Sequence, residues 1–181
     1  MARIPYFDRT KATGRAAAAY EKLPALNIFA MMGHAGELID GFTRLGTQIL
    51  NFTSLDPVLR EIAIVRVGVL SGATYEVFQH ERIARRLGMS EALVAAIHEG
   101  PGAAALDDAQ RQVMAFTDDV VANVRASDAT FDPLKERLGY KALQELTITV
   151  GYYMLVSRFL ETFDVDIEQG AAPKVNVSGP S

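Results

Sequence analysis

Three side chains suited to acid–base chemistry lie close together in this sequence. Glu76 and His80 are four residues apart within the stretch Ala73–His80, ATYEVFQH, and Glu61 precedes Glu76 by fifteen residues. Residues four apart are neighbours on one face of a helix, so the Glu76 carboxylate can hold and orient the His80 imidazole. A carboxylate beside an imidazole near an apolar wall is suited to general acid or base catalysis. The alternative interpretation is a structural ion pair or a satisfied core histidine.

Glu61 is the third candidate because its neighbours in the sequence are apolar. The four residues Ile62–Val65 follow it directly, in a segment with few charged residues. A carboxyl group in such a helix loses its contact with water, which favours its uncharged form and allows it to donate as well as accept a proton. The alternative is a salt bridge to an arginine, for example Arg66 or Arg158.

The elements that must position these residues are helices. Runs of alternating apolar and polar residues, the mark of a half-buried strand, are missing, so the sequence predicts an all-α fold. Helix-favouring composition, apolar periodicity and end signals predict helices over residues 12–23, 37–52, 57–70, 74–87, 90–98, 109–124 and 141–163, with a further turn of helix at Ser127.

End signals and apolar stripes predict where these helices begin and end and which face of each is buried. Asp56 followed by Pro57 is typical of a helix start, and Gly88 of the position after a helix end. In the helix over 74–87, the stripe that contains Val77 and Ala84 also contains His80, which predicts that the histidine faces the core. In the helix over 37–52, the predicted buried stripe is Leu38, Phe42, Leu45 and Ile49.

Composition indicates an ordinary globular protein. Of 181 residues, 49% are apolar and 22% charged, and the formal net charge is −4, which gives no support to nucleic-acid binding. One domain is predicted over residues 1–169, followed by a flexible tail over 170–181. The N-terminus has no apolar secretion segment, and the run Leu146–Ser157 is too short to span a membrane, so we expect a cytoplasmic protein without a membrane partner.

The absence of cysteine removes several kinds of chemistry. With no cysteine in the chain, disulfides, thiolate metal sites, cysteine nucleophiles and thiol-based peroxide reduction are excluded. The three histidines, His34, His80 and His98, are scattered without the spacing of a metal site. Phosphate-binding loops and dinucleotide fingerprints are also missing, so no metal and no cofactor are expected.

One segment resembles a known family. The stretch LDPVLREIAIVRVGVLSGATYEVFQHERIARRLGMSEALVAAI is similar to the core of the carboxymuconolactone decarboxylase family, within the alkyl hydroperoxidase D-like superfamily. In the peroxidase branch the pattern is a glutamate, eleven residues, Cys-x-x-Cys, three residues and a histidine. Glu61 and His80 match that spacing, but Ala73 and Glu76 occupy the two cysteine positions. Without these thiols the peroxide chemistry cannot run, so the chain resembles a branch without cysteine.

The resemblance implies a fold and an activity. It implies an alkyl hydroperoxidase D-like helical bundle that forms homo-oligomers, with the site near a subunit contact. The decarboxylase branch uses no metal or organic cofactor and acts on a lactone that bears a carboxylate. The expected function is therefore a cofactor-independent carboxy-lyase for a small molecule, with His80, Glu76 and Glu61 as catalytic residues and with Arg66, Tyr75 and His34 as substrate-binding residues. The alternative is a non-catalytic oligomer of the same fold that binds a small ligand.

Overall fold

The part of the chain that the structure describes is entirely helical. The structure, a computed structural model, describes residues 1–168, so the tail predicted over 170–181 lies outside the described residues. The helices are α1 (Gly14–Tyr20), α2 (Asn27–Met32), α3 (Leu38–Asn51), α4 (Pro57–Ser71), α5 (Thr74–Arg86), α6 (Glu91–Glu99), α7 (Asp108–Asn123) and α8 (Asp128–Phe163), with short 3-10 helices η1 (Arg9–Lys11) and η2 (Gly33–Ala35). The predicted all-α class is confirmed. Within residues 1–168, no helix is both long and apolar enough to cross a membrane.

Helix α4 lies at the centre of the core. It begins where predicted, because the Asp56 side chain accepts hydrogen bonds from the N–H groups of Val58 and Leu59 and Pro57 occupies the first turn. It ends at Gly72, whose φ of 66° is left-handed. The segment Ile62–Val65 has no exposed surface, and α4 packs against α5, α7 and α8. The buried helix expected from the apolar sequence is therefore present.

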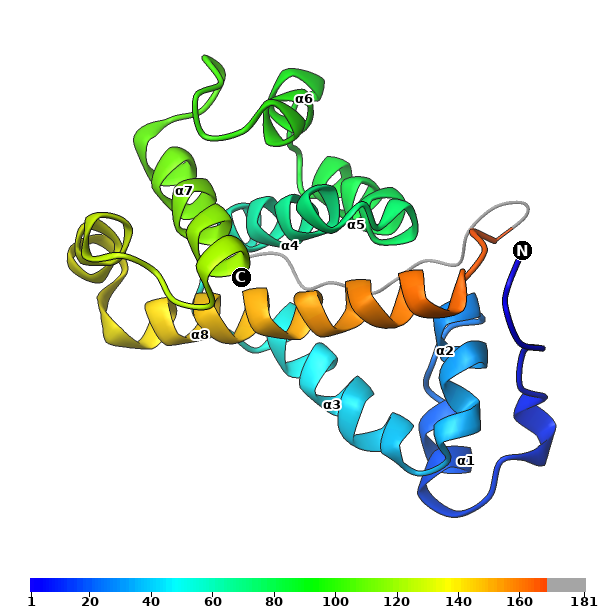
Figure 1. Ribbon diagram of the computed structural model, residues 1–181. Coiled ribbons are helices and arrows are strands. Elements are labelled where there is room, and N and C mark those ends of the chain that lie inside the picture. The colour runs from blue at the N-terminus through cyan, green and yellow to red at the C-terminus, as the bar shows by residue number, and fades with distance from the viewer. Residues whose placement is uncertain (169–181) are drawn as a thin grey trace.

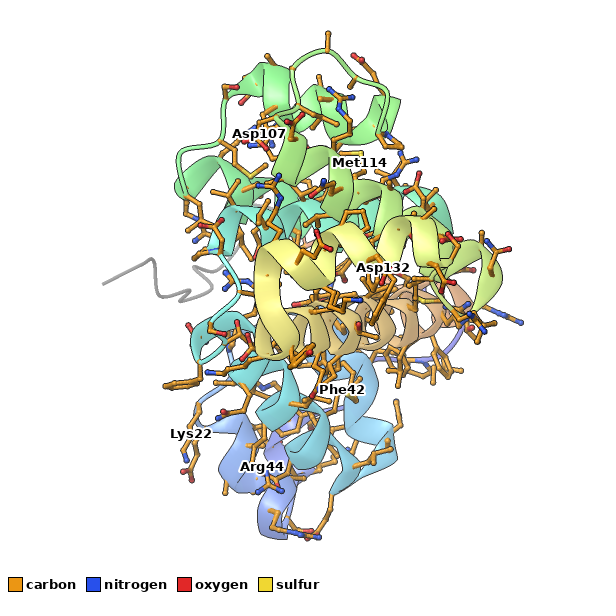
Figure 2. The ribbon with its side chains drawn as sticks, turned by 90° about the vertical axis from the view of Figure 1, so that its left-hand side faces the viewer. Lys22, Phe42, Arg44, Asp107, Met114 and Asp132 are labelled. Carbon is orange, nitrogen blue, oxygen red and sulfur yellow. The ribbon has the colours of Figure 1, made fainter. Side chains whose placement is uncertain are left out.

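Helix α8 runs across the molecule and separates two groups of helices. Figure 1 shows α4, α5, α6 and α7 on one side of α8 and α1, α2 and α3 on the other. Figure 2 shows the same division in the side chains, with Met114 of α7 and Phe42 of α3 on opposite sides of α8. The helix is broken at Gly139, with φ 69° and ψ 175°, so its long core-packing part follows that residue, as the sequence indicates.

The predicted buried stripe of α3 is right for Ile49, which is buried, and for Phe42, which is partly buried against the core, but wrong for its two leucines. Leu38 and Leu45 are 70% and 44% exposed. The buried residues of this helix are Ile39, Thr43, Gly46 and Ile49. The reason lies in the contact with α8, because a Cβ atom added at Gly46 would lie 2.6 Å from the Tyr152 hydroxyl. The helix turns its glycine toward α8 to permit this close approach, and two of its leucines face outward as a result.

The first residues of the chain pair with the segment that follows α8. The Arg3 N–H donates to the Phe163 carbonyl over 3.0 Å, and the Ala2 N–H donates to the Asp166 carboxylate over 3.1 Å. Tyr6 donates its hydroxyl proton to the same carboxylate. Figure 1 shows the N-terminal segment close to the end of α8. These contacts hold residues 165–168 against the side of the molecule on which α2 lies.

Candidate active site

The fold brings His80 of α5 against Glu61 of α4. The imidazole Nδ1 lies 2.7 Å from Glu61 Oε2, in hydrogen-bonding geometry. Glu61 has no exposed surface and His80 is 7% exposed. The two residues are nineteen positions apart, and only the packing of α4 on α5 brings them together. Glu61 therefore reaches His80, a contact that the sequence left open.

Glu76 occupies the other side of the same imidazole. His80 Nε2 lies 3.0 Å from Glu76 Oε1, the contact expected from their spacing on one helix. This contact is short but poorly directed, and Glu76 Oε1 has no hydrogen bond within residues 1–168, so the pair is held mainly by charge. Both nitrogens of His80 thus face a carboxylate, and neither is free to bond directly to a ligand.

The two carboxylates hold His80 in its charged form. Burial by itself would lower the pKa of His80, but the charges of Glu61 and Glu76, together with the Glu61 hydrogen bond, outweigh it and raise the pKa of His80 to about 10. The imidazole is therefore a cation at neutral pH. With both ring nitrogens protonated, it donates to Glu61 through Nδ1 and faces Glu76 through Nε2.

Arg60 completes a buried ion cluster. Its Nε donates to Glu61 Oε1 over 3.2 Å, and the arginine is 2% exposed. The buried ion cluster consists of Arg60, Glu61, Glu76 and His80. With His80 protonated, two cations face two carboxylates, so the cluster carries no net charge, which limits the cost of burying four ionisable groups.

Two tyrosines of α8 form the wall beside His80. The Tyr153 ring meets the imidazole edge to face, with 4.8 Å between centroids, and Tyr152 meets Tyr153 in the same way at 5.2 Å. Burial raises the pKa of Tyr153 well above its usual range, so its phenol keeps its proton. The tyrosines give His80 an aromatic, uncharged boundary.

A cleft of about 1230 Å³ opens beside this cluster. Its walls come from α1, α2 and α3 on one side and from α5 and α8 on the other, with Glu76, His80, Tyr152 and Tyr153 among the lining residues. Glu61 is not one of the described residues that line it, because His80 lies in front. The row Glu61, His80, Glu76 therefore connects the core to the cleft, which both His80 and Glu76 line. Lys22 and Arg44 also line it, and Figure 2 labels both near the α1–α3 end.

The structure places the three predicted substrate-binding residues differently. Tyr75 lines the cleft and is 3% exposed. Arg66 lies elsewhere, where its guanidinium makes two hydrogen bonds to the Asp118 carboxylate, of 2.7 and 2.8 Å, and joins α4 to α7. His34 bonds through Nε2 to the Pro5 carbonyl over 2.7 Å and is not among the cleft residues described.

Sequence reasoning missed two residues at the site. Arg60, and neither Arg66 nor Arg158, is the arginine paired with Glu61. Gln79 lines the cleft beside His80. Both adjoin predicted site residues in the sequence, and Gln79 is also four positions after Tyr75, so helical spacing was a signal for it. Within residues 1–168, no group of three acidic or histidine side chains is arranged to hold a metal ion.

Comparison with known proteins gives a family match for part of the chain. Residues 36–119 match the model of the carboxymuconolactone decarboxylase family, and this segment contains the glutamates and the histidine of the buried ion cluster. No curated protein matches the sequence.

Solved structures with a similar fold come from three bacteria. An uncharacterized peroxidase-related protein from Ralstonia eutropha with the alkylhydroperoxidase AhpD core superimposes with a TM-score of 0.74 at 15% identity, covering 93% of each chain. A protein of unknown function from Agrobacterium tumefaciens, named after the antioxidant defence protein AhpD, gives 0.71 at 17% identity over 76% of this chain and 96% of the other. An uncharacterized peroxidase-related protein from Silicibacter gives 0.67 at 17% identity over 74% and 71%. The fold is thus AhpD-like.

Proposed function

We propose that this protein, whose residues 36–119 match the model of the carboxymuconolactone decarboxylase family, is a cofactor-independent lyase that acts on a small carboxylated or lactone substrate. The observation that carries the proposal is the row Glu61, His80, Glu76, which leads from the buried core to a large cleft. Such a row can move a proton between the cleft and groups that water does not reach. The absence of cysteine leaves no thiol for the peroxide chemistry of related proteins.

The geometry favours Glu76 as the residue that exchanges a proton with the substrate. Both nitrogens of His80 are engaged by carboxylates, whereas Glu76 faces His80 through Oε1 and also lines the cleft. His80 then acts behind Glu76, as its proton source. Glu61 and Arg60 hold the imidazole in place and balance its charge. In this proposal His80 acts through Glu76 and not directly on the substrate.

The reaction that fits this proton path is the loss of carbon dioxide from an unsaturated lactone. The bond between the carboxylate carbon and the ring breaks, and its electron pair remains on the substrate as an extended dienolate. The Nε2 proton of charged His80 passes to the Glu76 carboxylate, and Glu76 delivers it to one carbon of the dienolate, which leaves His80 neutral. Solvent returns the proton, so that one proton is consumed for each molecule of carbon dioxide released.

Turnover of carboxylated lactones by matched variants tests the proposal. Carbon dioxide release is measured for the wild type, for Glu76→Gln and for Glu81→Gln, which changes a glutamate of the same helix that pairs with Arg85 and His98 outside the cleft. We expect Glu76→Gln to lower kcat by roughly 10²–10⁴-fold, as loss of a general acid does. Glu81→Gln should stay within about twofold of the wild type, by comparison with surface changes of small effect. Equal turnover by Glu76→Gln and the wild type would show that the proton path is wrong.

A second candidate function is the binding of a small ligand without turnover. The observation that favours it is that His80 is held on both sides by carboxylates, as in a structural ion cluster. It predicts ligand binding in the cleft with no carbon dioxide release from any carboxylated lactone. Detection of Glu76-dependent turnover would exclude it.

A further inference from the structure

The carboxylate of Glu168 occupies a set of three hydrogen-bond donors in the cleft region. Its Oε1 accepts from the Asn27 N–H over 2.7 Å and from the Tyr75 hydroxyl over 2.5 Å. Its Oε2 accepts from the Gln79 Nε2 over 2.7 Å. We call Asn27, Tyr75 and Gln79 the carboxylate cradle. Both oxygens of one carboxylate are thus bound by donors from two helices that are distant in the sequence.

We propose that the carboxylate cradle is the subsite that recognises a carboxylate of the ligand, and that Glu168 fills it when no ligand is bound. The inference rests on the proposed function in one respect, namely that the bound ligand is a substrate. The subsite itself is defined by its three donors and does not depend on turnover. The ligand class is a small organic carboxylate. The expectation that Arg66 recognises the carboxylate does not fit its position, since its guanidinium is bound to Asp118.

The two cradle residues on α5, Tyr75 and Gln79, lie next to Glu76 and His80. Tyr75 and Gln79 are four residues apart, and Glu76 and His80 are the residues that follow each of them. Residues four apart lie on one side of a helix, so the two pairs form neighbouring rows along α5. All four residues line the same cleft. A ligand carboxylate in the cradle would therefore hold the attached carbon skeleton beside Glu76.

The donors suit an occupant that can be exchanged. Tyr75 and Gln79 are 3% and 7% exposed, so their polar groups need a partner and an empty cradle would be costly. Burial and the Glu168 carboxylate raise the pKa of Tyr75 above its usual range, so its hydroxyl remains a donor. None of the three donors is charged, unlike an arginine fork, which would hold one carboxylate more strongly. A competing carboxylate can therefore replace Glu168.

Glu168 can leave the cradle without the rest of its segment. Two residues earlier, the Asp166 carboxylate accepts hydrogen bonds from the Ala2 N–H and the Tyr6 hydroxyl, and the Asp166 carbonyl accepts from the Asn27 side chain. These contacts do not involve the Glu168 carboxylate. The segment thus stays anchored at Asp166 while Glu168 alone is displaced. Glu168 acts as a competitor built into the chain.

Binding of benzoate to variants of the full chain tests this inference without any need for turnover. Benzoate and its uncharged analogue benzamide are titrated into the wild type, Glu168→Ala and Glu168→Gln, and the amide signals of the cradle are followed by NMR. If Glu168 fills the cradle about ten times in eleven, its removal should tighten benzoate binding about tenfold. Benzamide binding should change by less than about twofold, because it lacks the charge that the three donors stabilise.

Two further variants serve as a matched control and as a test that the cradle itself binds benzoate. Glu161→Ala, which removes an exposed glutamate of α8, should bind benzoate as the wild type does. Adding Gln79→Leu to Glu168→Ala should abolish the gain. Equal benzoate affinity in the wild type and both Glu168 variants, or an equal gain for benzamide, would overturn the inference. Tighter benzoate binding in a protein without lyase activity would retain the cradle and reject the proposed function.

Discussion

Raising the pH should destabilise this protein in a way that His80 alone explains. In the folded state the carboxylates of Glu61 and Glu76 raise the pKa of His80 to about 10. In the unfolded chain a histidine has a pKa of about 6.5. Between these two values the native state holds a proton that the unfolded state has lost. The stabilisation is therefore complete below about pH 6.5 and is lost as the pH rises toward 10.

The size of the effect follows from that single proton. Each pH unit in this window lowers the free energy of unfolding by about 1.4 kcal/mol, so the loss between about pH 7 and about pH 9 is roughly 3 kcal/mol. Buried tyrosines act in the same direction, because their raised pKa values also keep a proton in the native state. Their effect begins only near pH 10, where tyrosines of the unfolded chain ionise, so it lies outside this window.

Urea unfolding at pH 7, 8 and 9 measures the effect, followed by far-UV circular dichroism at one fixed protein concentration. His80→Gln is the control, since it lacks the imidazole but keeps the buried tyrosines and the surface groups of the wild type. We expect the stability difference between wild type and variant to shrink by roughly 3 kcal/mol over this range. If the two proteins lose stability in parallel, His80 does not hold an extra proton, and the reasoning on the buried ion cluster fails.

Two other predictions concern packing and a buried ion pair, both measured by urea unfolding. Gly46→Ala should destabilise the protein by about 1–3 kcal/mol because its Cβ would meet the Tyr152 hydroxyl, although alanine normally favours a helix. The loss of stability should be smaller when the same change is made in Tyr152→Phe. An equal loss in both backgrounds would contradict the packing argument. Arg66→Met should lower the free energy of unfolding by about 2–4 kcal/mol, since it leaves the partly buried Asp118 carboxylate without its arginine. Arg85→Met, which removes an exposed ion pair, should lower it by under about 1 kcal/mol. Similar losses in the two variants would contradict the importance of burial.

Local signals in the sequence predicted what local physics controls. Asp56 and Pro57 began α4 because a capping carboxylate and a fixed φ act within one turn. The contact between Glu76 and His80 followed from helical geometry alone. The all-α class followed from composition and periodicity over the whole chain.

Contacts between distant helices were beyond such signals. The hydrogen bond of Glu61 to His80 depends on how α4 lies on α5, and no spacing rule fixes that. Arg66 pairs with Asp118, fifty-two residues away, which removed it from the cleft. On α3 the count of apolar residues favoured Leu38, but the close approach at Gly46 decided which face is buried.

The contacts between residues 1–6 and residues 163–168 can form only late in translation. The hydroxyl of Tyr6 meets its acceptor, Asp166, across 160 residues of sequence. At roughly 5–20 residues per second, a ribosome needs about 10–30 s to make that length of chain. During this interval residues 1–6 lack the partners that they have in the folded protein, and the Asn27 N–H lacks its acceptor, the Glu168 carboxylate. In a nascent chain the carboxylate cradle therefore stays without its internal carboxylate until Glu168 has been made.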